Sequence, residues 1–155
     1  MIDGTKAGRI PWKRIALGTL LLLVGAQLVP VDTRNPPTPP ANSIYAAESV
    51  PPNVRAIFDS SCNNCHSNET RWPWYSHVAP FSWIVAHDVH RGRRLMNFSE
   101  WAGYGEKKRD QKLEDICDQL MNGDMPDGKY LLIHRSARLS QEQKESVCRW
   151  TQAPR

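Results

Sequence analysis

Three residues with metal- or carbon-bonding side chains fall within five positions of one another: Cys62, Cys65 and His66, in the pattern C-x-x-C-H. The spacing places the two thiols about one helical turn apart on the same side of the backbone, where each can add to one vinyl group of a haem. The histidine that follows can offer a ring nitrogen to the iron as the proximal ligand. The chain has only four cysteines and five histidines, so this clustering predicts one covalently attached c-type haem.

The same cysteines leave two other interpretations open. A tetrahedral zinc site formed with Cys62 and Cys65 would need two more ligands, which Cys117 and Cys148 can supply. These two cysteines stand singly, however, whereas zinc knuckles and ribbons usually close with a second tight pair. A thioredoxin-like redox motif would accompany a βαβ pattern, and no strand-like alternation precedes the motif. Haem attachment is therefore the preferred interpretation and zinc the runner-up.

A cluster of cations and then a long apolar run lie near the start of the chain. The run covers residues 15–31, contains only Thr19 and Gln27 as polar residues, and is near the short limit for a bilayer crossing. A cleaved signal peptide and a signal anchor both fit, but the apolar residues continue beyond the small residues at 24–26, which favours an uncleaved anchor over residues 1–31. The positive-inside rule then places the haem motif on the outer, periplasmic or extracytoplasmic side of the cytoplasmic membrane, which suits covalent haem assembly. The cations are Lys6, Arg9, Lys13 and Arg14.

Proline dominates the next segment. Prolines are paired at 36–37, 39–40 and 51–52, and such pairs favour the extended polyproline conformation, so residues 32–52 are expected to form a semi-rigid linker. The length of the chain then allows one small domain over residues 53–155. The net charge of +4 is carried partly by the N-terminal cations and does not indicate nucleic-acid binding.

Hydrophobic periodicity predicts an all-α domain. Helices are expected directly before the motif from about Asn53, from Pro80 to about Leu95, along the apolar stripe of residues 113–121, and after a capping box at residues 140–143. Residues 97–105 are expected to form a turn and residues 124–128 a loop. The arginines at 91, 93 and 94 can pair with haem propionates. A haem motif at the end of the first helix, a methionine in a later loop and a final helix follow the plan of cytochromes c.

The sequence resembles the bacterial membrane-anchored haem-binding domain family. The resemblance rests on Cys62–Tyr75, Val78-Ala-Pro80, residues 97–101, residues 123–126 and the Gln27–Asp32 exit from the apolar run. It implies a c-type haem held by the C-x-x-C-H motif outside the cytoplasmic membrane. It implies no reaction, because the family is defined by haem binding.

Met125 is the predicted sixth iron ligand, since it stands in a loop fixed by Gly123 and Pro126. His77, His87 and His90 are alternative ligands, and an open site is the third possibility. A haem with a histidine and a methionine ligand has no open position and acts as a one-electron carrier, here with an unknown redox partner protein. The alternative is a haem-based sensor of small ligands or a peroxidase-type enzyme.

Cys117 and Cys148 are also expected to form a disulfide, because an exported domain matures in an oxidising compartment. Cys117 lies on the apolar stripe of its helix and Cys148 adjoins Val147 in the terminal helix. Two separately buried thiols are the alternative, because free cysteine is among the most buried residue types.

Overall fold

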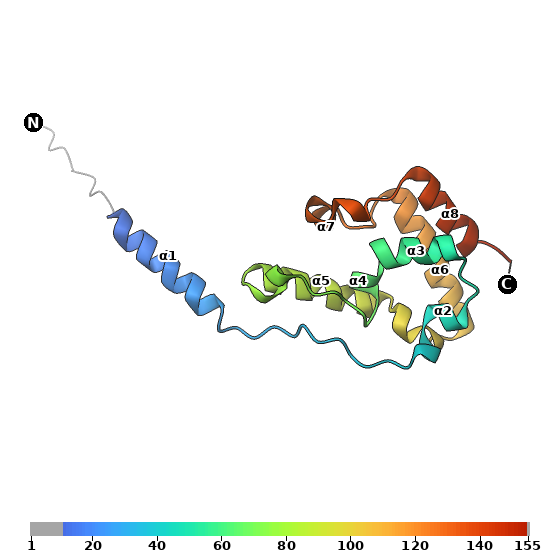
Figure 1. Cartoon of the computed structure of the whole chain (residues 1–155), viewed down its shortest axis with the longest axis horizontal. Coiled ribbons are helices and arrows are strands. Elements are labelled where there is room, and N and C mark those ends of the chain that lie inside the picture. The colour runs from blue at the N-terminus through green and yellow to red at the C-terminus, as the bar shows by residue number, and fades with distance from the viewer. Residues whose placement is uncertain (1–10, 155) are drawn as a thin grey trace, which may run out of the picture. The chain divides into compact units, whose positions relative to one another are not determined.

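The computed structural model describes residues 11–154, and every regular element in that range is a helix. The predicted all-α fold class is therefore confirmed. Figure 1 shows the helices in chain order from blue to red. The chain divides into two compact units. Unit 1 comprises residues 11–33 and Pro73–Ala86, and unit 2 comprises Arg34–Trp72 and residues 87–154.

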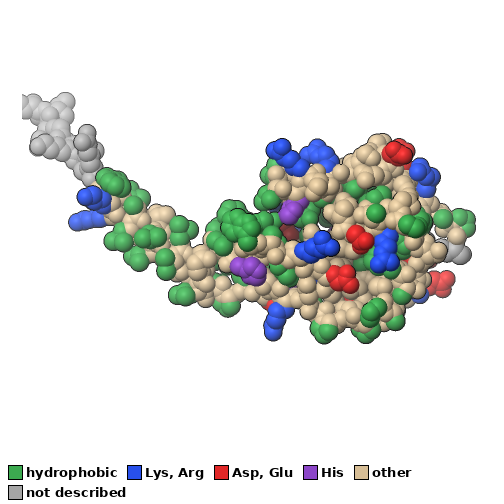
Figure 2. All heavy atoms as spheres, in the orientation of Figure 1, with side chains coloured by type: hydrophobic (Ala, Val, Ile, Leu, Met, Phe, Trp, Pro, Cys, Tyr) green, Lys and Arg blue, Asp and Glu red, His purple; other side chains and the backbone are tan. Residues whose placement is uncertain are grey.

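Unit 1 contains the apolar helix α1, Trp12–Ala26, the 3-10 helix η2, Trp74–His77, and the first turns of α5, Phe81–Leu95. No side chain of α1 is buried, and Figure 2 shows hydrophobic side chains along it. No helix within residues 11–154 is long and apolar enough to cross a membrane. Residues 1–10 of the predicted anchor lie outside the described residues, and the anchor stays a prediction.

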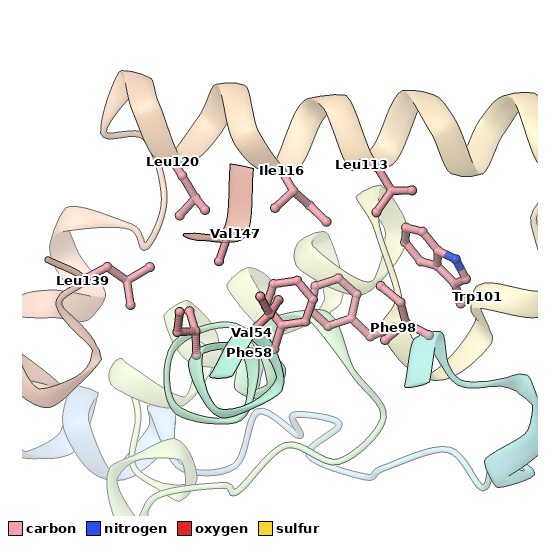
Figure 3. Packing of buried hydrophobic residues seen from close by; sticks show 11 residues of the cluster. Val54, Phe58, Phe98, Trp101, Leu113, Ile116, Leu120, Leu139 and Val147 are labelled. Atoms are coloured by element: carbon pink, nitrogen blue, oxygen red, sulfur yellow. The ribbon is translucent and has the colours of Figure 1, made fainter. Parts of the chain in front are cut away.

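Unit 2 has a core formed by three helices that lie far apart in the sequence. These are α3, Pro52–Ser61, α6, Glu106–Asn122, and α8, Gln141–Thr151. Figure 3 shows side chains of α6 pointing toward those of α3. Phe58 of α3 stacks on Phe98 with ring centroids 4.9 Å apart and meets Trp150 of α8 edge-on at 5.6 Å. The fully or nearly fully buried members include Val54, Phe58, Trp101, Leu113 and Val147.

The helix-end signals in the sequence act as predicted. Gly123 ends α6 in the left-handed region, with φ of 79°, which glycine adopts without steric cost. Ser140 opens α8 with a complete capping box, because its side chain accepts the Gln143 N–H while the Gln143 side chain accepts the Ser140 N–H. These signals fix the ends of α6 and α8.

The predicted linker is not an extended stalk throughout. It forms the 3-10 helix η1, Pro40–Asn42, and the short helix α2, Ile44–Ala47, and Ile44 is fully buried in the core. Glu48 accepts a hydrogen bond of 2.9 Å from the Trp101 indole N–H. The proline pairs restrict this segment, but burying its apolar side chains outweighs their preference for extended backbone. The folded domain therefore begins well before Asn53.

Four shorter elements complete unit 2. The haem motif forms α4, Asn63–His66, and the predicted turn after α5 is a 3-10 helix, η3, Phe98–Gly103. The predicted loop after α6 is present but ends at Asp127, whose side chain caps α7, Gly128–Ile133, by accepting the Lys129 N–H at 2.7 Å. Helix α7 was not predicted. The 3-10 helix η4, Arg135–Ala137, leads toward α8.

Candidate functional site

The C-x-x-C-H residues lie on one turn at the end of α3. Cys62 breaks the helix with φ of −121° and ψ of −42°, and its carbonyl oxygen then accepts the N–H groups of Cys65 at 3.1 Å and His66 at 3.0 Å. This turn holds both thiols and the imidazole within a single loop of backbone hydrogen bonds. Neither thiol is part of a disulfide.

The His66 ring is oriented by a backbone carbonyl. Its Nδ1 lies 3.1 Å from the carbonyl oxygen of Met96. Because a carbonyl can only accept, Nδ1 must carry the proton, which leaves the lone pair on Nε2. Burial lowers the pKa of His66, which favours this neutral form. A neutral histidine that donates from one ring nitrogen to a carbonyl is the form in which histidine ligates a metal with the other.

Burial keeps both thiols of the motif protonated at neutral pH. Desolvation is the largest cause for each, and it raises the pKa of Cys62 to about 12 and that of Cys65 to about 11. Protonated thiols are poor ligands for zinc, which binds the thiolate. Addition to a vinyl group, in contrast, consumes both the sulfur and its proton. The protonated thiols therefore suit addition to haem vinyl groups.

Helix α5 approaches the motif through a glycine. A Cβ atom placed on Gly92 would lie 2.6 Å from the carbonyl oxygen of Cys65 and 3.2 Å from its Cβ. The obstructing atoms belong to backbone and to the start of a side chain, which cannot move aside cheaply. Only glycine allows this close packing of α5 against α4. A single glycine inside a helix was the signal in the sequence, and it is ambiguous without the structure.

Arg93 stabilises the backbone around the motif through hydrogen bonds. Its guanidinium donates to the carbonyl oxygens of Ser67 and Arg34 and to the side chains of Asn35 and Thr70, at 2.7–3.2 Å. The side chain is buried, so these bonds join α5 to the loop after the motif and to the start of unit 2. The expected pairing of Arg93 with a haem propionate is thus unsupported. Arg91 and Arg94 are exposed.

Tyr130 of α7 contacts the motif and was missed by the sequence analysis. Its hydroxyl oxygen accepts a 3.0 Å hydrogen bond from the Asn64 side chain, and its ring stacks on His134 at 4.2 Å. Burial is the main cause that raises its pKa, with smaller contributions from Cys65 and Cys62. The only sequence signal was the spacing of four between Tyr130 and His134, which suits a helix face.

Met125 lies in the loop between α6 and α7, as predicted. Its N–H donates to the Gln119 carbonyl at 3.2 Å, and its half-buried side chain packs against the core cluster that Cys62 also contacts. Met121 is exposed on α6. Met96 packs against the same cluster, and its backbone carbonyl accepts the hydrogen bond from Nδ1 of His66. Met125 lies in the predicted loop, and its role as an iron ligand is carried forward as a proposal.

The three alternative histidines belong to different units. His77 lies in unit 1, at the end of η2, and His87 and His90 lie on α5 in unit 2. His77 and His87 are exposed, and His90 is half-buried. Their role as alternative iron ligands stays a prediction.

The zinc alternative is wrong for this structure. Cys117 and Cys148 are joined by a disulfide between α6 and α8, with sulfurs 2.03 Å apart, and so cannot supply thiolates. No group of three or more His, Cys, Asp or Glu side chains within residues 11–154 is arranged to hold a metal ion. The physical reason is the separation of the two cysteine pairs, one at the end of α3 and the other between α6 and α8.

A small all-α domain with a C-x-x-C-H turn and a neutral, carbonyl-oriented histidine has the features of the haem-binding class of proteins. The sequence comparison agrees, because the model of the haem-binding domain family matches residues 21–153. The chain belongs to this family, and the match extends from the middle of α1 to the end of α8 and beyond. Searches of curated proteins and of solved structures found no match.

Proposed function

We propose that this protein is a membrane-anchored c-type haem protein that carries single electrons on the outer face of the cytoplasmic membrane. The observation that carries the proposal is the His66 imidazole, whose Nδ1 donates to the Met96 carbonyl and whose neutral form burial favours, on the same turn as two free thiols. The family match supports haem as the group that these residues hold.

Cys62 and Cys65 would attach the haem as thioethers. In each attachment the thiol S–H bond and one vinyl π bond break, and a carbon–sulfur and a carbon–hydrogen bond form, so no oxidant is needed. The bound haem supplies iron that is oxidised and reduced by one electron. His66 and Met125 would each hold the iron, through a ring nitrogen and a thioether sulfur. Two protein ligands leave no position for oxygen or peroxide, which favours electron transfer over ligand sensing or catalysis.

Several sequence and structural features support the membrane location. Lys13 and Arg14 stand at the start of α1, while the apolar run beyond them contains no charged residue up to Val31. The positive-inside rule orients such a segment with its start in the cytoplasm. The Cys117–Cys148 disulfide supports an oxidising compartment for unit 2.

Optical spectra of protein matured with export and haem-assembly machinery test the proposal. The protein is expected to keep its haem through denaturing electrophoresis and to show a six-coordinate reduced spectrum that carbon monoxide does not change. The Cys62→Ala/Cys65→Ala variant should lose the haem-stained band, whereas Cys117→Ala/Cys148→Ala, which also removes two cysteines, should keep it. Loss of haem from the unaltered protein in the gel would rule out covalent attachment.

A further inference from the structure

Unit 1 exposes a second apolar surface in addition to helix α1. Five apolar side chains, 39–78% exposed, lie on η2, on the turn after it and on the first turns of α5. We call this surface the aromatic patch; it consists of Trp74, Val78, Phe81, Trp83 and Ile84. Large exposed apolar side chains concentrated in one segment can mark a site that binds a partner or a membrane.

Two serines near the aromatic patch are buried, while larger apolar side chains beside them are exposed. Phe81 is 54% exposed, while its neighbour Ser82 is 4% exposed, and Ser76 of η2 is fully buried. Ser76 satisfies its hydroxyl by donating to the Pro73 carbonyl at 2.6 Å. An amphipathic element normally buries its apolar side chains and exposes its polar ones. Exposed rings beside buried serines suit a surface that faces an apolar medium.

Gln27 joins the aromatic patch to the apolar helix. Its side-chain amide accepts the Ala79 N–H at 3.0 Å and donates to the Ala79 carbonyl at 3.2 Å. The same NH₂ group donates to the Leu23 carbonyl of α1 at 3.0 Å. Ala79 lies between Val78 and Phe81 of the patch, so the patch and the end of α1 are fixed together. This pairing also gives a reason for one of the two polar residues in the run 15–31.

Charge and composition indicate which medium is involved. Residues 73–86 contain no Asp, Glu, Lys or Arg, and neither does the run 15–31. Trp and Tyr are enriched where a membrane meets water, because each has an apolar ring with a polar edge. Trp74 and Trp83 are exposed, and Tyr75 is half-buried with its ring edge-on to Trp74 at 5.8 Å.

We propose that the aromatic patch seats in the lipid interface of the membrane that holds α1. This inference rests on the membrane anchoring argued above. The Gln27–Ala79 pair would hold the patch at the depth where α1 leaves the membrane, so the chain has two lipid contacts, one helical and one formed by residues 73–86. The patch thereby fixes the rotation of unit 1 about the axis of α1, which a single helix leaves free.

Photolabelling of the haem-loaded full chain in vesicles tests this inference. The vesicles contain phosphatidylethanolamine and phosphatidylglycerol, with a trace of phospholipid that carries a diazirine near the carbonyl end of one acyl chain. Trypsin then releases the apolar run as residues 15–34, the patch as residues 72–91, and residues 130–135 as a control. The control peptide contains Leu132 and Ile133, which are 76% and 63% exposed in unit 2.

Lipid adducts are expected on residues 15–34 and 72–91 and not above background on residues 130–135. Adducts on 15–34 with none on 72–91 would overturn the inference and leave the anchor intact. Absence of adducts from both peptides would overturn the anchor as well. The two failures are therefore distinguishable.

Two variants sharpen the assignment to these side chains. Trp74→Ser/Phe81→Ser/Trp83→Ser should lose the adducts on 72–91 and keep those on 15–34, whereas Leu95→Ser/Met121→Ser, which changes exposed apolar residues of unit 2, should lose neither. Unchanged adducts in the triple variant would contradict the inference. If the triple substitution instead abolishes self-association of the detergent-solubilised protein and leaves the lipid adducts intact, the patch binds a second copy of the chain and the inference is overturned.

Discussion

Units 1 and 2 place the same types of residue in opposite environments. Unit 1 exposes the leucines of α1 together with Phe81 and Trp83, and it buries Ser76 and Ser82. Unit 2 buries Phe58, Phe98 and Trp101 and places most of its charged side chains on the surface. Hydrophobicity alone therefore does not say which residues form a core.

The difference between the units corresponds to a division of tasks. The candidate haem ligands and both thiols belong to unit 2, where burial keeps His66 neutral and the thiols protonated. Unit 1 has no buried ionisable side chain among its described residues and offers apolar surface instead. The two proposals above thus assign the haem chemistry to unit 2 and the contact with lipid to unit 1.

The substitution with the largest expected effect tests whether all iron ligands come from unit 2. Met125→Ala should abolish the weak near-infrared absorption of sulfur-to-iron(III) charge transfer and let carbon monoxide bind the reduced haem, because the sixth ligand is removed. His77→Ala, in unit 1, and Met121→Ala, on the exposed face of α6, should leave both properties unchanged.

An effect of His77→Ala on the spectrum would break the division between the units, because a residue of unit 1 would then ligate the iron. If the unaltered protein lacks the near-infrared band and already binds carbon monoxide, Met125 is not a ligand. The sensor or peroxidase interpretation would then replace the electron carrier.

Two phenylalanines provide a matched test of burial. Phe58→Ala removes a fully buried ring that stacks on Phe98, and it should lower the free energy of unfolding by about 3–5 kcal/mol. Phe81→Ala removes a ring that is mostly exposed and should change the same quantity by less than about 0.5 kcal/mol. Denaturant titration of the detergent-solubilised protein, followed by circular dichroism, measures both. Equal losses would show that residues 73–86 are packed as a core and do not form a free surface.

The disulfide joins two core helices of unit 2 and should contribute less than the buried ring. Cys117→Ala/Cys148→Ala should lower the free energy of unfolding by about 3 kcal/mol, because the cross-link limits the unfolded chain across a sequence separation of 31. Haem content should not change. Thiol labelling of the denatured, unreduced protein is the direct check, and two reactive cysteines in it would show that the bridge is absent in solution.

Local signals predicted the helices that have periodic apolar faces or distinct caps. The residues before Cys62, the stripe along α6, the Gly123 end and the Ser140 capping box each depend on neighbours a few positions away. The C-x-x-C-H turn is local in the same sense. These features are visible in the sequence because the interactions that create them span a single helical turn.

Features that depend on distant residues were not predictable. Ile44 is buried by core residues that follow it in the sequence, between positions 54 and 147. The proline content of its segment therefore wrongly predicted an extended linker. The contacts of Gly92 with Cys65 and of Tyr130 with Asn64 join elements far apart in the chain. The hydrogen bonds between Gln27 and Ala79 likewise join residues far apart in the chain, so nothing in the sequence indicated them.

The substitution with the smallest expected effect concerns the start of a helix, which differs between the two units. Helix α8 begins at a full capping box, while α1 begins after Pro11 with no side-chain cap. Ser140→Ala leaves the Gln143 N–H without its partner and should lower the free energy of unfolding of unit 2 by about 1 kcal/mol. Ser140→Asp restores an acceptor at the same position, and its negative charge is favourable at a helix N-terminus, so this control should recover most of the loss. Denaturant titration of the three proteins gives both differences. No loss in the alanine variant would show that α8 is held by packing of Val147 and the disulfide rather than by its cap, and both helices would then begin without help from a side chain.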